Sequence, residues 1–247
     1  MNRNRRLHEE MIQMRHVLLC GWLGILTSAM LAVASGSGAN SQPASGPSAL
    51  DQDSKGWVDL LSGKDLQGWK RVPIPPDKTL NAKNPWSLAD GGRTLHCDGV
   101  GVKEMFLHEH VRGDGIFHVE WRFQKVAAKT GYNSGVYVRT AADGTVWHQA
   151  QVAHLDKPPL LGDLFGETRV DGQMKHFQVL GQGSKLARPP GEWNTYEITC
   201  KGKTITVRVN GTVATTWDDC QVPRGHVGLQ AEFFVIDFRN LKFKALP

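Results

Sequence analysis

The stretch NSGVYVRTAADGTVWHQAQV, residues 133–152, decides the fold class. Residue types alternate on either side of Asp143-Gly144, and a period of two is typical of β-strands, whose successive side chains point to opposite faces of a sheet. An Asp-Gly pair between two such runs is a strong signal for a tight turn. The stretch therefore predicts an antiparallel hairpin.

The length of the turn sets the register of this hairpin. A two-residue turn pairs Arg139 with His148 and mixes polar and apolar residues on both faces. A three-residue loop at residues 142–144, with its glycine in the left-handed conformation, instead pairs Tyr137 with Gln149. We favour the second register, because a buried face specifies strand pairing and a one-residue slip would bury the amides.

The favoured register divides the hairpin into a core face and a polar face. The core face holds Val136, Val138, Ala150 and Val152, with His148 as its single misfit. The polar face holds Tyr137, Arg139, Trp147, Gln149 and Gln151. Such a face can be merely solvated, but solvated faces usually carry Lys, Glu, Thr and Ser. Because aromatic, amide and guanidinium groups together suit stacking on a sugar ring and hydrogen bonding to its hydroxyls, we expect a carbohydrate site.

Similar alternation recurs along the chain. In FHVEWRF, residues 117–123, four apolar residues alternate with His, Glu and Arg. ITVRVNG repeats the pattern and then turns at Asn210-Gly211, a pair that tolerates the positive φ of a tight hairpin. VGLQAEF and VIDFRNLKF supply two more runs. Many short strands separated by turns predict an all-β fold, an antiparallel sandwich or barrel.

The N-terminal segment has the features of an export signal. Four arginines precede an uncharged run, residues 17–34, which ends in Ala-Val-Ala. An uncleaved membrane anchor is the alternative, since the run is near the lower length limit for spanning a bilayer. We favour a signal peptide at residues 1–34 that is cleaved without leaving stable membrane insertion, which predicts a periplasmic or secreted protein.

After the signal, residues 35–54 are rich in Ser, Gly, Ala and Pro, so we expect a flexible linker before a single domain at residues 55–247. Removing residues 1–34, which hold four Arg and two Glu, lowers the formal charge from +5 to +3. No run of Lys and Arg follows the signal. Nucleic acid is therefore not an expected partner.

An oxidising compartment permits disulfides between the remaining cysteines. Cys200 and Cys220 flank a strand-turn-strand segment and are predicted to pair, whereas Cys97 is predicted to be a free buried thiol. No C-x-x-C pair is present, which argues against a zinc knuckle or a redox motif.

Several motifs, in this order, resemble the bacterial exported family of 3-keto-disaccharide hydrolase domains. They are GWVDLLSGKDLQGWK, NPWSLADGGRTLHCDG, NSGVYVR, GEWNTYEI, the VNG hairpin, VGLQAE and IDFRNLKF, spanning about residues 56–244. The resemblance implies a concanavalin A-like jelly roll, with a ligand groove on its concave face. It implies 3-keto-glycosides as substrates, supplied by a separate sugar oxidoreductase. We expect no cofactor.

The implied chemistry begins at a ketone on C3, which acidifies the proton on C2. A base removes this proton, the C1 substituent leaves, and hydration gives net hydrolysis. The route needs a base, a group that stabilises the enolate oxygen and an acid for the leaving group. The family's strand after the NSG motif commonly carries Glu, Gln and Asp where this chain has Gln149, Gln151 and His154, so two carboxylates are replaced.

The candidates follow from residue type and position. His154, with a near-neutral unperturbed pKa, is the preferred base; its alternative is a loop histidine. Glu120 is a second candidate for the base; its alternative is a partner for Arg122 or Arg139. Arg139 and Gln149 could hold the enolate oxygen. The residues expected to bind substrate are Asn133, Tyr137, Trp147, His148, Gln151 and Glu232.

Two of these residues have weighed alternatives. His148 could be an acid or a histidine at the edge of the core, and we favour the second; Glu232 is a second carboxylate candidate. A metal site built from His148, His154 and Asp163 lacks any recognised ligand spacing, so no metal is expected. Three functions stay open: a lyase or hydrolase acting on oxidised glycosides, a non-catalytic carbohydrate-binding module of the cell envelope, and a structural or adhesion domain.

Overall fold

The computed structural model describes residues 46–126, 131–155 and 160–247. The predicted signal peptide and residues 35–45 of the predicted linker lie outside these residues. All the described residues belong to one compact unit, Gln42–Pro247. Within them, no helix has the length and apolar character needed to cross a membrane.

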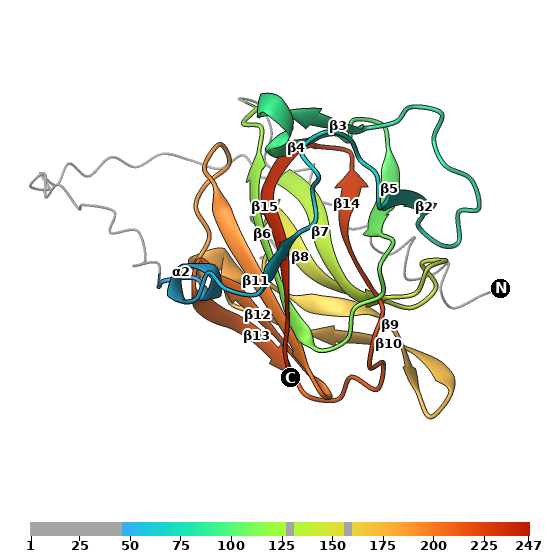
Figure 1. The fold of residues 1–247 in the computed structure, drawn as a ribbon. Helices are drawn as coiled ribbons and strands as arrows, with labels where there is room; N and C mark the ends of the chain where they lie inside the picture. Colours follow the sequence, from blue (N-terminus) through green and yellow to red (C-terminus); the bar gives the residue numbers. More distant parts are fainter. Residues whose placement is uncertain (1–45, 127–130, 156–159) are drawn as a thin grey trace, which may run out of the picture. The chain divides into compact units, whose positions relative to one another are not determined.

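The described unit is a sandwich of two antiparallel sheets, as predicted, and contains hardly any helix (Figure 1). Sheet A contains eight strands: β13 (Thr212–Trp217), β12 (Thr204–Val209), β11 (Asn194–Lys201), β6 (Gly115–Phe123), β15 (Val235–Ala245), β4 (Thr94–Asp98) and β3 (Trp86–Ala89) in spatial order, with β1 (Trp57–Asp59) paired to β15.

Sheet B contains seven strands and positions the candidate site. In spatial order they are β10 (Gln173–Val179), β9 (Leu164–Val170), β8 (Trp147–Leu155), β7 (Gly131–Thr140), β14 (His226–Glu232), β5 (Lys103–His108) and β2 (Trp69–Pro73). Two short 3-10 helices, Asp90–Gly92 and Gly183–Lys185, interrupt the loops.

The main hydrophobic core lies between the two sheets. From β6 it receives Phe117, Val119, Trp121 and Phe123, the four apolar residues of the FHVEWRF stretch. Val136, Val138, Ala150 and Val152 face them from sheet B, which confirms the predicted core face of the hairpin. The opposite face of sheet B, which carries the amides, is therefore its outer face, away from sheet A. Burial of the core side chains stabilises the fold by about 25 cal/mol per Å² of apolar surface removed from water.

The β7–β8 hairpin has the predicted register. Tyr137 pairs with Gln149 and Gly135 pairs with Gln151. Gly144 has a φ of 71°, the left-handed conformation that the turn requires. A second predicted turn, Asn210-Gly211 between β12 and β13, has φ values of 49° and 81°, as a two-residue hairpin turn of this kind demands.

The structure differs from the predicted linker at its C-terminal end. Residues Ala49–Gln52 form the short helix α2, which begins with a capping box between Ser48 and Asp51. The backbone N–H of Ala49 donates to both carboxylate oxygens of Glu197 on sheet A, over 2.7 and 2.8 Å. This segment is therefore attached to the domain, because a buried carboxylate supplies the acceptors that its first N–H groups need.

The predicted Cys200–Cys220 disulfide is absent, and the prediction was wrong. All three described cysteines are free and buried, as predicted for Cys97 alone. Cys220 Sγ instead lies 3.6 Å from His148 Nε2 and 3.5 Å from the carbonyl oxygen of Val222. Flanking a hairpin in sequence did not bring the two sulfur atoms into bonding contact.

Candidate functional site

A connected row of amide side chains crosses the outer face of sheet B. Gln149 Nε2 donates to Gln151 Oε1 over 2.7 Å and to Gln230 Oε1 over 3.1 Å. Gln151 Nε2 donates to Asn133 Oδ1 over 2.5 Å, and Gln230 Nε2 donates to Glu232 Oε2 over 2.7 Å. We refer to these four amides and the carboxylate at their end as the amide row.

Three neighbouring strands supply this row because their register aligns alternate residues on one face. Gln149 and Gln151 come from β8, Asn133 from β7, and Gln230 and Glu232 from β14. The three glutamines are almost fully buried. Buried amides need partners, since an unpaired buried polar group costs about 1–3 kcal/mol, and here each glutamine finds them within the row.

Gly135 makes the centre of the row possible. A Cβ at this position would lie 2.4 Å from Cδ and Nε2 of Gln149, far inside contact distance. The missing side chain therefore leaves the space in which the Gln149 amide lies across β7 towards Gln230. This gives the glycine of the NSG motif a specific packing role.

The hydrogen bonds also fix the polarity of the row. A carboxylate only accepts, so Glu232 draws the Nε2 of Gln230 towards itself and leaves Gln230 Oε1 to accept from Gln149. The bonds of the row use Nε2 of Gln149 and Oδ1 of Asn133, and they leave Oε1 of Gln149 and Nδ2 of Asn133 outside the row. The row thus offers an acceptor at Gln149 and a donor at Asn133.

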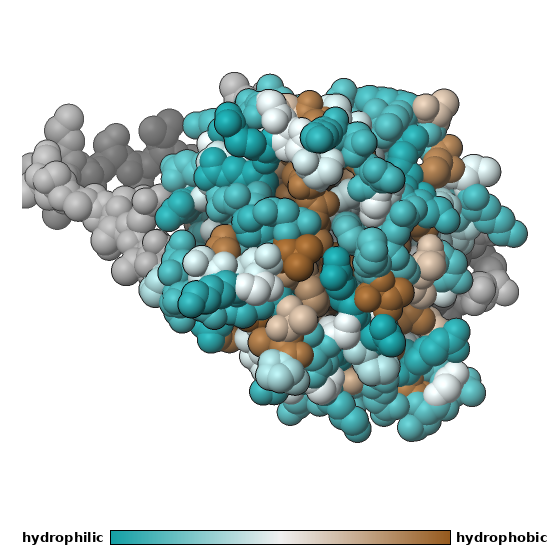
Figure 2. Space-filling model, in the orientation of Figure 1, coloured by the Kyte–Doolittle hydropathy of each residue, from teal (hydrophilic) through white to brown (hydrophobic). Residues whose placement is uncertain are grey.

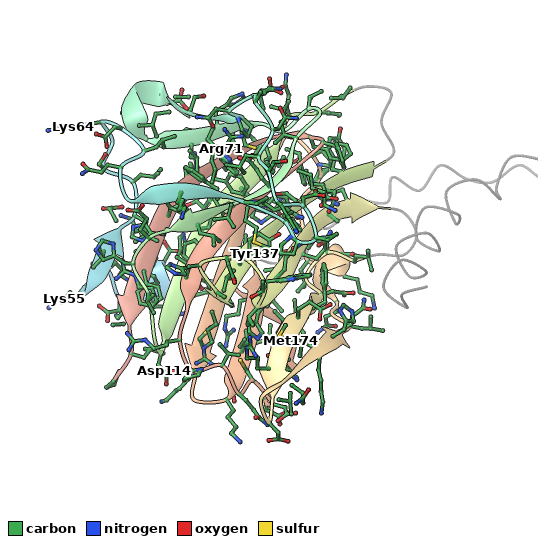
Figure 3. The ribbon with its side chains drawn as sticks, turned by 90° about the vertical axis from the view of Figure 1, so that its right-hand side faces the viewer. Lys55, Lys64, Arg71, Asp114, Tyr137 and Met174 are labelled. Atoms are coloured by element: carbon green, nitrogen blue, oxygen red, sulfur yellow. The ribbon has the colours of Figure 1, made fainter. Side chains whose placement is uncertain are left out.

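An apolar cluster borders the row on the same face. It contains Val72, Ile74, Met105, Leu107 and Tyr137, with Trp147 packed against them. Trp147 makes edge-to-face contacts with Tyr137 and Phe165, whose ring centroids lie 6.2 and 5.5 Å away. Figure 3 shows Tyr137 near the middle of this side of the molecule. Aromatic rings next to paired amides are a common arrangement for holding a sugar ring.

Tyr137 stays a neutral phenol. Burial raises its pKa well above the usual value, and the charge of Glu232 raises that pKa further. Tyr137 lies opposite Gly228 on β14, the strand that also carries Glu232. The face therefore combines a carboxylate that can accept a proton with a phenol that can donate a hydrogen bond.

Asp163 lies at the far side of the row, in a bulge opposite Gln151. The backbone N–H of Gln151 donates to the carbonyl oxygen of Asp163, and the N–H of Gly162 donates to that of Gln151. Its carboxylate accepts from the Gly181 N–H over 2.8 Å and from Gln178 over 3.3 Å. Burial raises the pKa of Asp163. It is a second carboxylate beside the row.

Arg139 does not lie on this face, so its predicted place beside Gln149 is wrong. Strand β7 carries one extra residue opposite β14 between Tyr137 and Thr140, and Arg139 in this bulge has a φ of 47°. The bulge turns its side chain towards Asp114 and the carbonyl oxygen of Gly202, at 2.9 and 2.8 Å. Figure 3 shows Asp114 at the lower end of the molecule, well away from Tyr137.

His154 and His148 also point away from the amide row. His154 lies between the sheets with its ring against Trp121, Phe123 and Tyr132, and burial lowers its pKa to about 4. His148 is fully buried, its Nε2 lies 2.9 Å from Thr168 Oγ1, and burial lowers its pKa to about 4. In β8 the side chain of residue 154 points to the same face as those of Ala150 and Val152, which is the core face. The preferred base therefore does not lie beside Gln149 and Gln151.

Glu120 belongs to the other sheet. On the outer face of sheet A, its carboxylate accepts hydrogen bonds from Arg239 Nε over 2.7 Å and from Asn240 Nδ2 over 2.6 Å. Despite its burial, its hydrogen bonds with His118, Asn240 and Arg239 lower its pKa to about 2. Glu120 is therefore an arginine partner, as the alternative held, but its partner is Arg239 and not Arg122 or Arg139.

Of the residues predicted to form a site, the structure brings together Asn133, Tyr137, Trp147, Gln149, Gln151 and Glu232. Sequence reasoning missed Gln230 as a site residue, although its alternation with Glu232 was visible. Within the described part of the chain, no group of three or more His, Cys, Asp or Glu side chains is arranged to hold a metal ion.

Similar solved structures show the fold. A protein named as a candidate glycosyl hydrolase from Parabacteroides distasonis ATCC 8503 is 17% identical with a TM-score of 0.55, over 82% of this chain and 99% of that chain. A second such protein from that organism is 23% identical with a TM-score of 0.52, over 77% and 99%. Carbohydrate-binding module CBM66 from Bacillus subtilis is 12% identical with a TM-score of 0.52, over 72% and 96%.

A search of curated proteins found no match. A family model does match, over residues 56–244, which is most of the chain and nearly all of the described sandwich. The chain belongs to the family of 3-keto-alpha-glucoside-1,2-lyase-like domains.

Proposed function

We propose that this protein cleaves 3-keto-glycosides on the outer face of sheet B, by removal of the proton on C2 and loss of the C1 substituent. The observation that carries the proposal is the meeting of Glu232, a neutral Tyr137 and the amide row on one face. Family membership supports the same chemistry. The ketone must come from a separate oxidoreductase acting on the C3 hydroxyl of the glycoside.

Glu232 is the proposed base in place of His154. Its carboxylate is held by Gln230 Nε2 at 2.7 Å and is oriented by that bond. When it takes the C2 proton, the electron pair of the C–H bond forms the enolate, whose negative charge collects on the C3 oxygen. A positioned carboxylate base typically contributes roughly 10²–10⁴-fold to the rate of such a step.

Tyr137 is the proposed donor to the enolate oxygen. A donor aimed at the atom where charge develops stabilises the transition state more than the ground state. The raised pKa of Tyr137 keeps its proton in place at neutral pH. The enolate then expels the C1 substituent with its bonding electron pair, a proton from solvent completes the alcohol, and addition of water to the resulting enone gives net hydrolysis.

The amides hold the sugar during these steps. Gln149 Oε1 can accept from a sugar hydroxyl, and Asn133 Nδ2 can donate to a sugar oxygen. Trp147, beside Tyr137, offers an aromatic ring. Because the row is already paired, it costs little reorganisation when substrate arrives.

The test follows aglycone release and exchange of the C2 proton with deuterium, using a glycoside and its 3-keto derivative. We expect only the 3-keto compound to react. Glu232→Gln should reduce the rate of exchange by roughly 10²-fold or more. Tyr137→Phe should reduce the rate of cleavage without unfolding the protein. The matched control is Glu167→Gln. Glu167 is a partly exposed carboxylate on β9 that pairs with His176 on β10, and its change should leave both rates unaltered.

The amide-rich face also suits a second function, a non-catalytic carbohydrate-binding module. The specific observation is that the two central positions, Gln149 and Gln151, carry amides that are bonded to each other. If the wild type binds glycosides with no deuterium exchange at C2, this second function replaces the first. If it exchanges the proton at the same rate as Glu232→Gln, Glu232 is not the base.

A further inference from the structure

Phe233 holds an unfavourable backbone conformation while its ring remains exposed. Its φ is 62°, in the left-handed region that bulky side chains rarely adopt. The residue is nonetheless 47% exposed, so burial of its ring does not offset the strain. Backbone strain of this kind persists where the surrounding structure enforces it, and it concentrates at functional sites.

The surroundings of Phe233 fix this conformation. The residue follows Glu232, the last residue of β14, in the turn that leads into β15 at the top of Figure 1. Its N–H donates to the carbonyl oxygen of Val102 over 3.1 Å, and the N–H of Gly99 donates to that of Phe234 over 3.1 Å. Phe234 packs against Tyr132 at 5.6 Å between ring centroids. One ring of the Phe-Phe pair is therefore an anchor, and the other is directed outwards.

Other exposed apolar side chains lie on neighbouring segments. Val100 is 55% exposed and Leu80 is 39% exposed. Their segments are tied together, since Asn81 Nδ2 donates to the carbonyl oxygen of Gly101 and Lys83 Nζ donates to that of Val100, both over 3.1 Å. The surface seen in Figure 2 is mainly hydrophilic with small hydrophobic patches, so an exposed strained phenylalanine needs an explanation.

We propose that Phe233 is a specificity-determining residue, which contacts an apolar face of the substituent on C1 of the bound glycoside. The inference rests on the proposed function, because it uses the placement of Glu232 at C2. C1 is bonded to C2, so the C1 substituent is the part of the substrate outside the ring that lies next to Glu232. The residue that follows Glu232 is then the one best placed to meet it.

The apolar face could belong to an aryl ring or to the C–H face of a second sugar. Both present a flat apolar surface on which a phenyl ring stacks, and such contacts are worth about a factor of five or more in affinity. A methyl substituent presents no such face. Affinity for aryl glycosides, disaccharides and methyl glycosides therefore distinguishes the two sources.

The experiment measures binding of uncleaved, unoxidised glycosides by titration calorimetry, so it does not depend on catalysis. We expect Phe233→Gly to weaken binding of an aryl glycoside or a disaccharide by roughly fivefold or more. Binding of the matching methyl glycoside should not change. Phe233→Tyr, which keeps the ring, should retain wild-type affinity, and glycine should not lower the melting temperature, because it adopts this φ freely.

Asp171→Gly is the matched control, since Asp171 is exposed with a φ of 51° in the β9–β10 turn. It should leave all affinities unchanged. Equal losses for methyl and larger glycosides, or none in Phe233→Gly, would overturn the inference, as would a wild type that binds no glycoside. If binding depends on Phe233 as expected but no 3-keto-glycoside is cleaved, the proposed cleavage fails, and the binding data alone still show that Phe233 contacts the C1 substituent.

Discussion

Arg139 donates from Nη2 to Asp114 Oδ1 over 2.9 Å, and its side chain is almost fully buried. Its other terminal nitrogen donates to the carbonyl oxygen of Gly202. This guanidinium therefore ties three segments together at one end of the sandwich. A charge in such a place stabilises the fold only while its partners remain.

We predict that Arg139→Met lowers the free energy of unfolding by about 2–4 kcal/mol, because it leaves the Gly202 carbonyl without its side-chain donor and Asp114 without its charged partner. Denaturant titration measures the loss. Arg169→Met, at an exposed position of β9, should change stability by less than about 0.5 kcal/mol. A stable Arg139→Met protein that had lost glycoside affinity would instead return Arg139 to the binding site.

Gly135→Ala should impair binding more than folding. The new Cβ would occupy the position of the Gln149 amide, so the row should open at its centre. We expect glycoside affinity to fall by roughly tenfold, corresponding to about 1.4 kcal/mol. Gly113→Ala is the control, since a Cβ there meets nothing within 4 Å. Equal affinities for both variants and the wild type would show that the row does not bind sugar.

The free energy of unfolding should fall in mild acid because of His148. Burial lowers the pKa of its ring to about 4, below the value of about 6.5 in the unfolded chain. The unfolded state then binds more protons below pH 6.5, so stability present above that pH is lost as the pH falls towards 4.

The expected contribution of His148 is about 2 kcal/mol between pH 7 and pH 5. Denaturant titrations at both pH values measure it. His148→Gln should show a smaller loss over the same interval, because glutamine does not titrate. An identical pH dependence in the two proteins would mean that the pKa of His148 is the same in the folded and the unfolded protein.

Thiol reactivity tests the state of the cysteines. In native protein, burial of all three side chains, and a Cys200 pKa raised by burial to about 12, should prevent alkylation at Cys97, Cys200 and Cys220. In unreduced protein unfolded with guanidinium, all three should react. Mass spectrometry counts the added groups, and protection of Cys200 and Cys220 that persists after unfolding would indicate a disulfide.

The sequence predicted the fold well where period-two alternation met a strong turn signal. The FHVEWRF strand and the two hairpins at residues 133–152 and 204–217 form with the predicted faces. In these places a buried face and a glycine turn point to the same register. The ordered start of the domain was not foreseen, because Glu197 is distant in sequence from α2.

The candidate site was predictable only within regular strands. Alternation places Gln149, Gln151 and Tyr137 on one face, but it fails at Arg139, because a bulge changes which way the side chain points. His154 was chosen from the resemblance, although the alternation along β8 already places position 154 on the core face. Contacts between strands far apart in the chain, such as Gln149 with Gln230, have no local signal.

The polarity of the amide row depends on one proton. Unprotonated Glu232 can only accept, and this orients every amide back to Asn133. If Glu232 takes the substrate proton, as proposed above, its carboxyl group can also donate, so the amide of Gln230 can rotate and the amides beyond it can follow. Substrate and product would then meet differently oriented hydrogen-bonding groups, and release of the product would be linked to the same proton transfer that formed it.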